Sequence, residues 1–178
     1  MLVADPRVDP GARDNHAFCF ACFNNFVDVV RVLLGHPRVD PCARAQKAFE
    51  VPVEDGHLEL VRMLLNEGSI DPAANDNAAL RRCVERGQVE MFKLLLADPR
   101  LDPSFDDNYL IKTCAAAGQL GMVELLLEDW RVDPASGDKV ALKTAKAGGH
   151  ETIHILLENR IDNPLPNPLK RKQGIRGI

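Results

Sequence analysis

The chain lacks any run of about 18 apolar residues, so it offers no segment that would cross a membrane as a helix. Aromatic residues make up only 5% of its 178 residues, and four of the seven phenylalanines lie between residues 18 and 26. Basic residues are outnumbered, 22 against 26 acidic ones, which argues against a domain that binds nucleic acid through a basic stripe. The N-terminus lacks the basic flank and apolar stretch of a signal peptide, so we expect an intracellular, cytoplasmic protein.

The five cysteines are an odd number, so they cannot all pair within one chain, and a reducing compartment is the expected environment. Cys19 and Cys22 stand three residues apart, with His16 before them and Cys42 after, and a helix would turn both thiols to one face. A structural zinc site usually repeats such a pair or adds two histidines, and neither is present. A metal centre at Cys19 and Cys22 is therefore the least favoured function, and no cofactor is expected.

Catalytic motifs are missing as well. The sequence contains no nucleophile elbow, no phosphate-binding glycine loop and no metalloprotease helix motif. Its most regular carboxylates, from Asp9 to Asp133, recur beside proline, where aspartate commonly forms turns. The sequence thus predicts a protein that is not an enzyme and has no catalytic residues.

What the sequence does have is a period of 31 residues. The dipeptide Asp-Pro returns at this spacing from Asp9-Pro10 to Asp133-Pro134. A Leu-Leu pair keeps the same period from Leu33-Leu34 onward, until its last copy arrives one residue early. The period predicts a partial repeat at 1–10, then five repeats at 11–41, 42–72, 73–103, 104–134 and 135–164. Residues 165–178 lack helical periodicity and carry four basic and no acidic residues, so we expect a flexible basic tail.

Each repeat reads as helix, turn, helix and loop. In the third repeat, Asp76 and Asn77 are expected to cap a helix from Ala78 to about Arg86. Gly87 can end that helix in a left-handed conformation, and a second helix follows from about Val89 to Ala97. Neither helix could bury its apolar face alone. Stacking of neighbours is therefore required, which predicts an all-α solenoid of helix–turn–helix units with projecting loops.

The repeats resemble ankyrin repeats. Residues 56–65 read Gly-His-Leu-Glu-Leu-Val-Arg-Met-Leu-Leu and residues 87–96 read Gly-Gln-Val-Glu-Met-Phe-Lys-Leu-Leu-Leu, similar to the family's Gly-His-x-Glu-Val-Val-x-Leu-Leu-Leu signature. The resemblance covers residues 1–164 and implies a protein-binding array in which His57 and His150 bond the backbone between repeats.

Two features depart from the ankyrin pattern. An Asp-Asn pair stands where the family opens its first helix with Thr-Pro-Leu-His. Pro52 falls inside the first helix of the second repeat, where we expect it to distort or shorten the helix at a cost of about 3 kcal/mol.

The resemblance implies a non-catalytic protein–protein interaction module that binds a partner through its loops and the exposed face of its first helices. These positions vary between repeats while the scaffold positions hardly change, as expected of a recognition surface. The candidate partner-binding residues are Arg13, Phe23, Arg44, Asn75, Asn77, Arg86, Phe105, Asp106, Tyr109 and Trp130. Exposed aromatic residues are the usual anchors of interfaces, although Trp130 could instead pack on the neighbouring repeat. The sequence does not identify the partner, and a structural spacer or a fragment of a longer array is the alternative.

The two ends of the repeats are distinctive. Phe18 and Phe20 align with inner positions of the later repeats, whereas Phe23 and Phe26 align with polar ones. Terminal repeats normally carry a polar outer face, so this end indicates either a cut from a longer array or self-association. The triplet Lys170-Arg171-Lys172 could be a nuclear-import or polyanion-binding signal, or simply part of a solvated tail.

Overall fold

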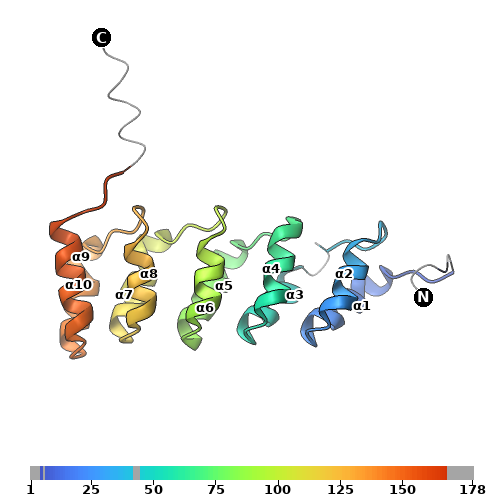
Figure 1. Cartoon of the computed structure of the whole chain (residues 1–178), viewed down its shortest axis with the longest axis horizontal. Coiled ribbons are helices and arrows are strands. Elements are labelled where there is room, and N and C mark those ends of the chain that lie inside the picture. The colour runs from blue at the N-terminus through green and yellow to red at the C-terminus, as the bar shows by residue number, and fades with distance from the viewer. Residues whose placement is uncertain (1–4, 6, 42–44, 168–178) are drawn as a thin grey trace, which may run out of the picture. The chain divides into compact units, whose positions relative to one another are not determined.

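A computed structural model describes residue 5 and residues 7–41 and 45–167 of the chain (Figure 1). These described residues form ten α-helices and no strand, and none of the helices is long and apolar enough to cross a membrane. Arg44, Cys42 and the Lys170-Arg171-Lys172 triplet lie outside the described residues.

The helices alternate along the chain between the first and the second member of a pair. The first helices are α1 (Ala12–Phe23), α3 (Ala45–Glu54), α5 (Ala74–Arg86), α7 (Phe105–Ala116) and α9 (Ser136–Ala147). The second helices are α2 (Val27–Leu34), α4 (Leu58–Glu67), α6 (Val89–Leu96), α8 (Leu120–Leu127) and α10 (Glu151–Asp162). The chain divides into two compact units, residues 1–101 with α1–α6 and residues 102–178 with α7–α10.

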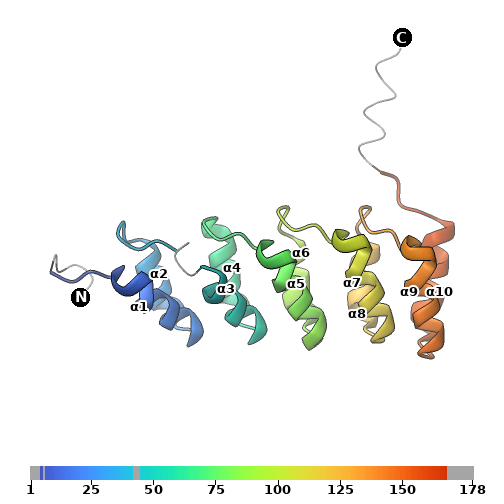
Figure 2. The same ribbon diagram turned by 180° about the vertical axis from the view of Figure 1, so that it is seen from behind.

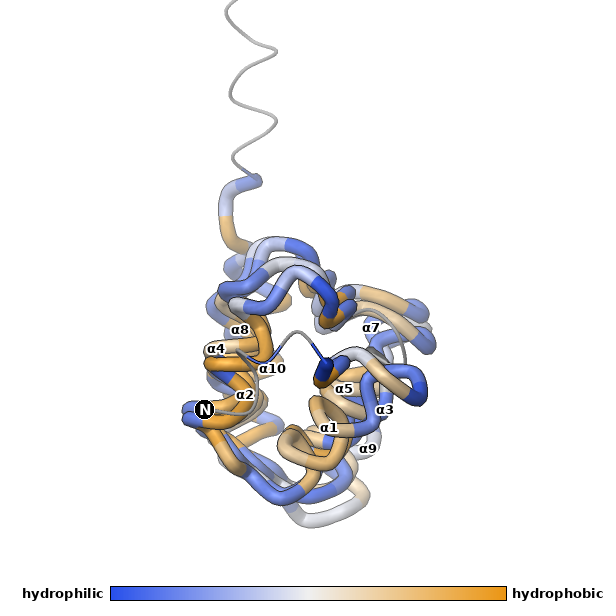
Figure 3. Tube along the Cα trace, turned by 90° about the vertical axis from the view of Figure 1, so that its right-hand side faces the viewer, coloured by the Kyte–Doolittle hydropathy of each residue, from blue (hydrophilic) through white to orange (hydrophobic). Residues whose placement is uncertain are grey.

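Within each unit the helix pairs stack side by side. In the first unit, α1 packs on α3 and α3 on α5, while α2 packs on α4 and α4 on α6 (Figures 1 and 2). Seen end-on, α2 and α4 lie on one side of this unit and α1, α3 and α5 on the other (Figure 3). In the second unit, α7 packs on α9 and α8 on α10. The predicted all-α, ankyrin-like helix–turn–helix architecture is confirmed.

The repeating leucines form the core of both units. Leu64, Leu95 and Leu126 occupy one repeat position, one period apart, and all three are fully buried. Full burial of a leucine stabilises a fold by about 1.5–3 kcal/mol. The 31-residue period of the sequence is therefore the spacing of residues that stabilise the core. Gly87 ends α5 with φ of 67°, as predicted from its place in the repeat.

The first turn of α1, α5, α7 and α9 is left-handed, a conformation that was not predicted from the sequence. We call residues 13–15, 75–77, 106–108 and 137–139 the left-handed turns; all have φ between 51° and 60°. Asp76 and Asn77 were predicted to cap a helix with their side chains, and that prediction is wrong because α5 has no side-chain cap hydrogen bond. Aspartate and asparagine adopt the left-handed region more easily than other residues with a side chain, so the same residue types favour this alternative.

Pro52 does not shorten its helix at the C-terminal end, contrary to expectation. α3 continues past Pro52 to Glu54, the repeat position at which α1, α7 and α9 also end. Pro52 and Val53 are both buried, and α3 packs on α1 and α5. This packing keeps the segment helical although proline cannot donate a backbone hydrogen bond.

Candidate partner-binding surface

Buried asparagines tie two of the left-handed turns to the loop that follows the next helix. Asn15 and Asn108 are the third residues of their turns and are almost completely buried. The backbone N–H of Asp40 donates to Oδ1 of Asn15 at 2.9 Å, and that of Asp133 donates to Oδ1 of Asn108 at 2.7 Å. Each bond spans 25 residues, so it links a turn to the loop at the end of the same repeat.

The first residue of each left-handed turn is exposed and differs from one turn to the next. These residues are Arg13, Asn75, Asp106 and Gly137. The second residue is aspartate in all four turns, and two of these aspartates bind a lysine of their own helix. Asp107 lies 2.5 Å from the ammonium of Lys112, and Asp138 lies 2.6 Å from that of Lys143, which lowers the pKa of Asp138. One backbone geometry therefore displays three different side chains and, in the fourth turn, a glycine.

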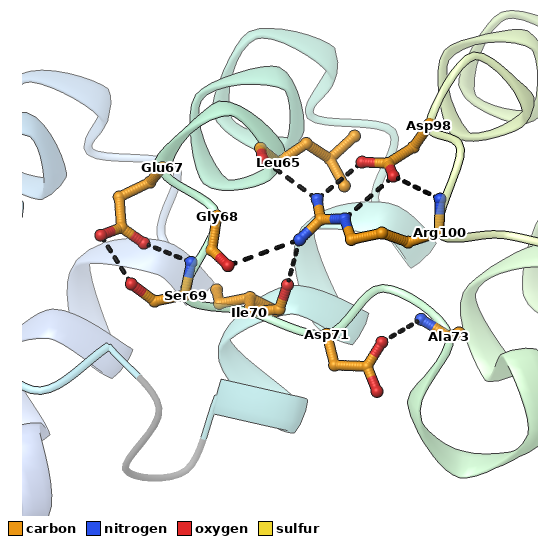
Figure 4. Close-up of polar contacts among 9 residues, drawn as sticks. All are labelled: Leu65, Glu67, Gly68, Ser69, Ile70, Asp71, Ala73, Asp98 and Arg100. Atoms are coloured by element: carbon orange, nitrogen blue, oxygen red, sulfur yellow. Dashed lines mark hydrogen bonds and ion pairs between the residues drawn. The ribbon is translucent and has the colours of Figure 1, made fainter.

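An arginine holds the loop after α6 against the preceding helix pair (Figure 4). Arg100 donates through Nη2 to the carboxylate of Asp98 at 2.6 Å and to the carbonyl of Leu65 at 3.1 Å. Its Nη1 donates to the carbonyl of Ile70 at 2.9 Å. The hydrogen bonds from Arg100 keep the pKa of Asp98 below its usual range. The guanidinium thereby satisfies carbonyls at the end of α4 and in the loop that follows it.

Other arginines make related contacts within their own units. Arg131 pairs with Asp129 at 2.6 Å, and Arg38 donates to the carbonyl of Val8 at 2.8 Å. Arg160 on α10 donates to the carbonyl of Leu127, the repeat equivalent of Leu65. None of these arginines is among the predicted site residues, although an Asp-x-Arg pattern at 98–100 and 129–131 repeats with the same period of 31 and contains Arg100 and Arg131.

Residues 45–96, which contain α3 to α6, match the family model described as ankyrin repeats (many copies). The chain therefore contains ankyrin repeats over this stretch. No curated protein matches the chain. Ankyrin repeats are in general protein-interaction modules and typically non-enzymatic, which favours a binding role for the candidate surface.

In the first unit, the described candidate residues lie at the two ends of the first helices. Arg13 and Phe23 stand at the start and end of α1, and both are exposed. At the start of α5, Asn75 donates through Nδ2 to Glu50 of α3 at 2.9 Å. At its end, Arg86 lies 3.7 Å from Glu54 of α3. Asn77 differs from these residues because its Oδ1 is buried, so it occupies the scaffold position of Asn15 and Asn108.

In the second unit the candidate residues include two aromatic contacts of different kinds. The rings of Phe105 and Tyr109 on α7 form a tilted pair with centroids 6.2 Å apart, and both side chains are half-buried. The exposed Asp106 lies between them in sequence. Trp130 stands in the loop between α8 and α9 and is 37% exposed. It lines a groove of about 220 Å³ together with Arg160 and the C-terminal segment. Trp130 therefore both contacts its neighbours and presents part of its ring to solvent.

The histidine position of the ankyrin signature is used in two ways. Gln88, which stands at this position before α6, donates through Nε2 to the carbonyl of Glu54 at 2.8 Å. This is the backbone bond between repeats that the resemblance implied for His57 and His150. The ring of His150 instead lies against Gly118, where a Cβ atom would come within 2.5 Å of it. The absence of a side chain at Gly118 therefore leaves room for the His150 ring.

The cysteines are suited to the core rather than to a metal. Cys19, Cys22, Cys83 and Cys114 are all buried. Burial raises the pKa of Cys22, Cys83 and Cys114 to about 12, which disfavours the thiolate that a metal requires. Within the described part of the chain, no three histidine, cysteine or acidic side chains lie close enough together to hold a metal ion.

Proposed function

We propose that this protein binds a protein partner, without catalysis, through its left-handed turns and the exposed face of its first helices. One observation carries the proposal: the turns share a single backbone conformation, with φ between 51° and 60°, while their exposed first residue changes from Arg13 to Asn75, Asp106 and Gly137. Solvated positions also vary in sequence, but they do not require a strained backbone to be rebuilt each time.

The left-handed backbone conformation is energetically unfavourable, so other contacts must stabilise it. A left-handed residue with a side chain is less stable by about 1–2 kcal/mol than the right-handed form, and three stand in succession in α1, α5 and α7. Such conformations persist only when the surrounding structure fixes them, and they concentrate at functional sites. Asn15 and Asn108 supply that fixation through the backbone N–H groups of Asp40 and Asp133. A surface held in this way loses little conformational entropy when a partner binds.

The aromatic pair on α7 is the proposed anchor in the second unit. At the positions of Phe105 and Tyr109, α5 carries Ala74 and Ala78. The helix–turn–helix scaffold therefore does not need aromatic rings at these positions. Paired aromatic side chains that keep part of their surface in solvent are typical centres of binding energy in interfaces.

We test the anchor by replacing Phe105 and Tyr109 together with alanine, the residues of α5. The double variant should keep its helicity. Its affinity for partners captured by the native chain should fall tenfold or more, and a tenfold loss corresponds to about 1.4 kcal/mol of binding free energy. Leu120→Ala, which truncates an exposed apolar side chain on α8, is the matched control and should bind as the native chain does.

Equal binding by all three proteins would show that the anchor lies elsewhere. The alternative function is a structural spacer, or a part of a longer array with no binding role of its own. It gains if the native chain captures no protein at all. We also propose a cytoplasmic location, which imaging of a fluorescent fusion tests.

A further inference from the structure

The first helix pair presents an uncovered apolar surface. Phe20 on α1, Phe26 before α2 and Val29 on α2 are 53%, 49% and 48% exposed. The rings of Phe20 and Phe26 lie 6.3 Å apart, and His16 stacks on Phe20 at 6.4 Å. We call Phe20, Phe26 and Val29 the N-terminal face. Phe18 does not belong to it because its side chain is fully buried. The expectation that Phe20 occupies an inner position is wrong, because Phe20 aligns with Arg82 and Thr113, neither of which is buried.

The repeat register identifies what kind of surface this is. At the position of Val29, α4 carries Leu60 and α6 carries Met91, which are 0% and 2% exposed. α4 and α6 each pack on the second helix of the preceding pair, and no described helix pair precedes α1 and α2. At the position of Phe26, Gln88 bonds the backbone of the preceding pair. The N-terminal face therefore corresponds to the stacking interface between repeats, on a pair that no described helix pair precedes.

The last helix pair is built differently. Lys146 of α9 is exposed at the repeat position where Val84 and Ala115 are buried, and Lys139 replaces the buried Asn108 of α7. Both lysines stand where a first helix faces the next pair, so stacking another pair there would remove two ammonium groups from water. This end is capped by polar residues in the way that terminal repeats usually are. Copies of the chain are therefore poorly suited to join first pair to last pair.

We propose that the N-terminal face binds the same face of a second copy of this chain and forms a closed, two-fold dimer. Such a contact is isologous, so each copy covers the phenylalanines and Val29 of the other. It removes apolar surface from water without burying the lysines of α9. Clustered exposed apolar side chains of this kind mark association surfaces in soluble proteins.

The test is the molar mass of the full chain by light scattering over a wide range of concentrations. The native chain should move from 19.7 kDa toward about twice that mass as its concentration rises. The variant Phe20→Thr with Phe26→Gln should remain a monomer under the same conditions. Its new residues are those that α7 and the residue before α8 carry at these positions, Thr113 and Gln119, so the repeat scaffold accepts them.

Ile155→Gln is the matched control, because Ile155 on α10 is equally exposed and should not affect the dimer. A native chain that stays monomeric, a dimer that persists in the double variant, or a mass that grows beyond the dimer would each overturn the proposal. If circular dichroism shows that the double variant is unfolded, hydrogen exchange of the native chain decides: the amides of α1 and α2 should exchange more slowly at high concentration. Unchanged exchange there would also overturn it.

Discussion

At the scale of single residues, two side-chain types fix the loops that carry the candidate surface. Asparagine does so from inside a left-handed turn, as Asn108 does by accepting the N–H of Asp133. Arginine does so from the loop itself, as Arg100 does by donating to Leu65 and Ile70. Asn108 acts on the backbone of its own repeat and Arg100 on that of the preceding repeat, so both set the loop geometry without restricting the exposed side chains nearby.

Replacing Asn108 with alanine should destabilise the protein by about 1–3 kcal/mol. The change leaves the N–H of Asp133 without its acceptor, and an unsatisfied buried polar group has a cost of this size. Urea denaturation followed by circular dichroism measures the difference. Asp106→Gly, in the same turn, is the control and should change stability little, because Gly137 stands at that position in α9. Equal stability of the Asn108 variant and the native chain would show that this bond does not hold the turn.

The Asp98–Arg100 pair predicts a loss of stability in acid. Because Arg100 lowers the pKa of Asp98 in the folded state, the folded carboxylate binds a proton less readily than the unfolded one. Its contribution is complete above the ordinary aspartate value of 3.8. It then declines as the pH falls below that value, and it is lost once the pH passes the lowered folded-state value. Denaturation curves at several acidic pH values should therefore fall less steeply with acidification for Asp98→Asn than for the native chain; parallel curves would contradict this origin.

At the scale of helices and turns, α3 is the element whose sequence fits its structure least well. Pro52 lies inside the helix, whereas α1 and α9 carry Ala21 and Ala145 at that position. Pro52→Ala restores a backbone hydrogen-bond donor and removes a steric clash, which should raise the free energy of unfolding by up to about 3 kcal/mol. The more flexible unfolded chain of the alanine variant should offset this gain by about 1 kcal/mol. We expect a net stabilisation of about 2 kcal/mol by urea denaturation. Lys47→Ala, at an exposed position of α3, should have little effect, and a destabilised Pro52 variant would refute the reasoning.

The sequence predicts the helices better than the turns between them. The period of apolar residues and Gly87 locate α5 and α6 to within a few residues, because burial follows the repeat. The left-handed turns could not be read in the same way, since aspartate and asparagine favour both helix caps and left-handed backbone. The inner position predicted for Phe20 is wrong for another reason: by the 31-residue period Phe20 aligns with Arg82 and Thr113, which are not buried. The contacts of Arg100 could have been suspected from the periodic Asp-x-Arg pattern.

At the scale of the whole molecule, the chain combines a repeated apolar scaffold with exposed positions that differ from repeat to repeat. The scaffold belongs to the ankyrin repeats matched at residues 45–96. The proposed function places partner recognition on the left-handed turns and first helices, whereas the proposed dimer uses the N-terminal face. These surfaces involve different residues, so each can be disrupted without the other.

The central claim is tested most directly by quantitative affinity capture with the full chain and two triple variants. The first variant, Arg13→Gly, Asn75→Gly and Asp106→Gly, replaces the exposed first residues of three left-handed turns with the glycine that α9 carries as Gly137. The second is a control on the second helices, Asp28→Ala, Glu59→Ala and Glu90→Ala, at exposed positions one period apart. The proteins captured by the native chain should be lost from the first variant and retained by the second. Retention by the turn variant would contradict binding through the left-handed turns.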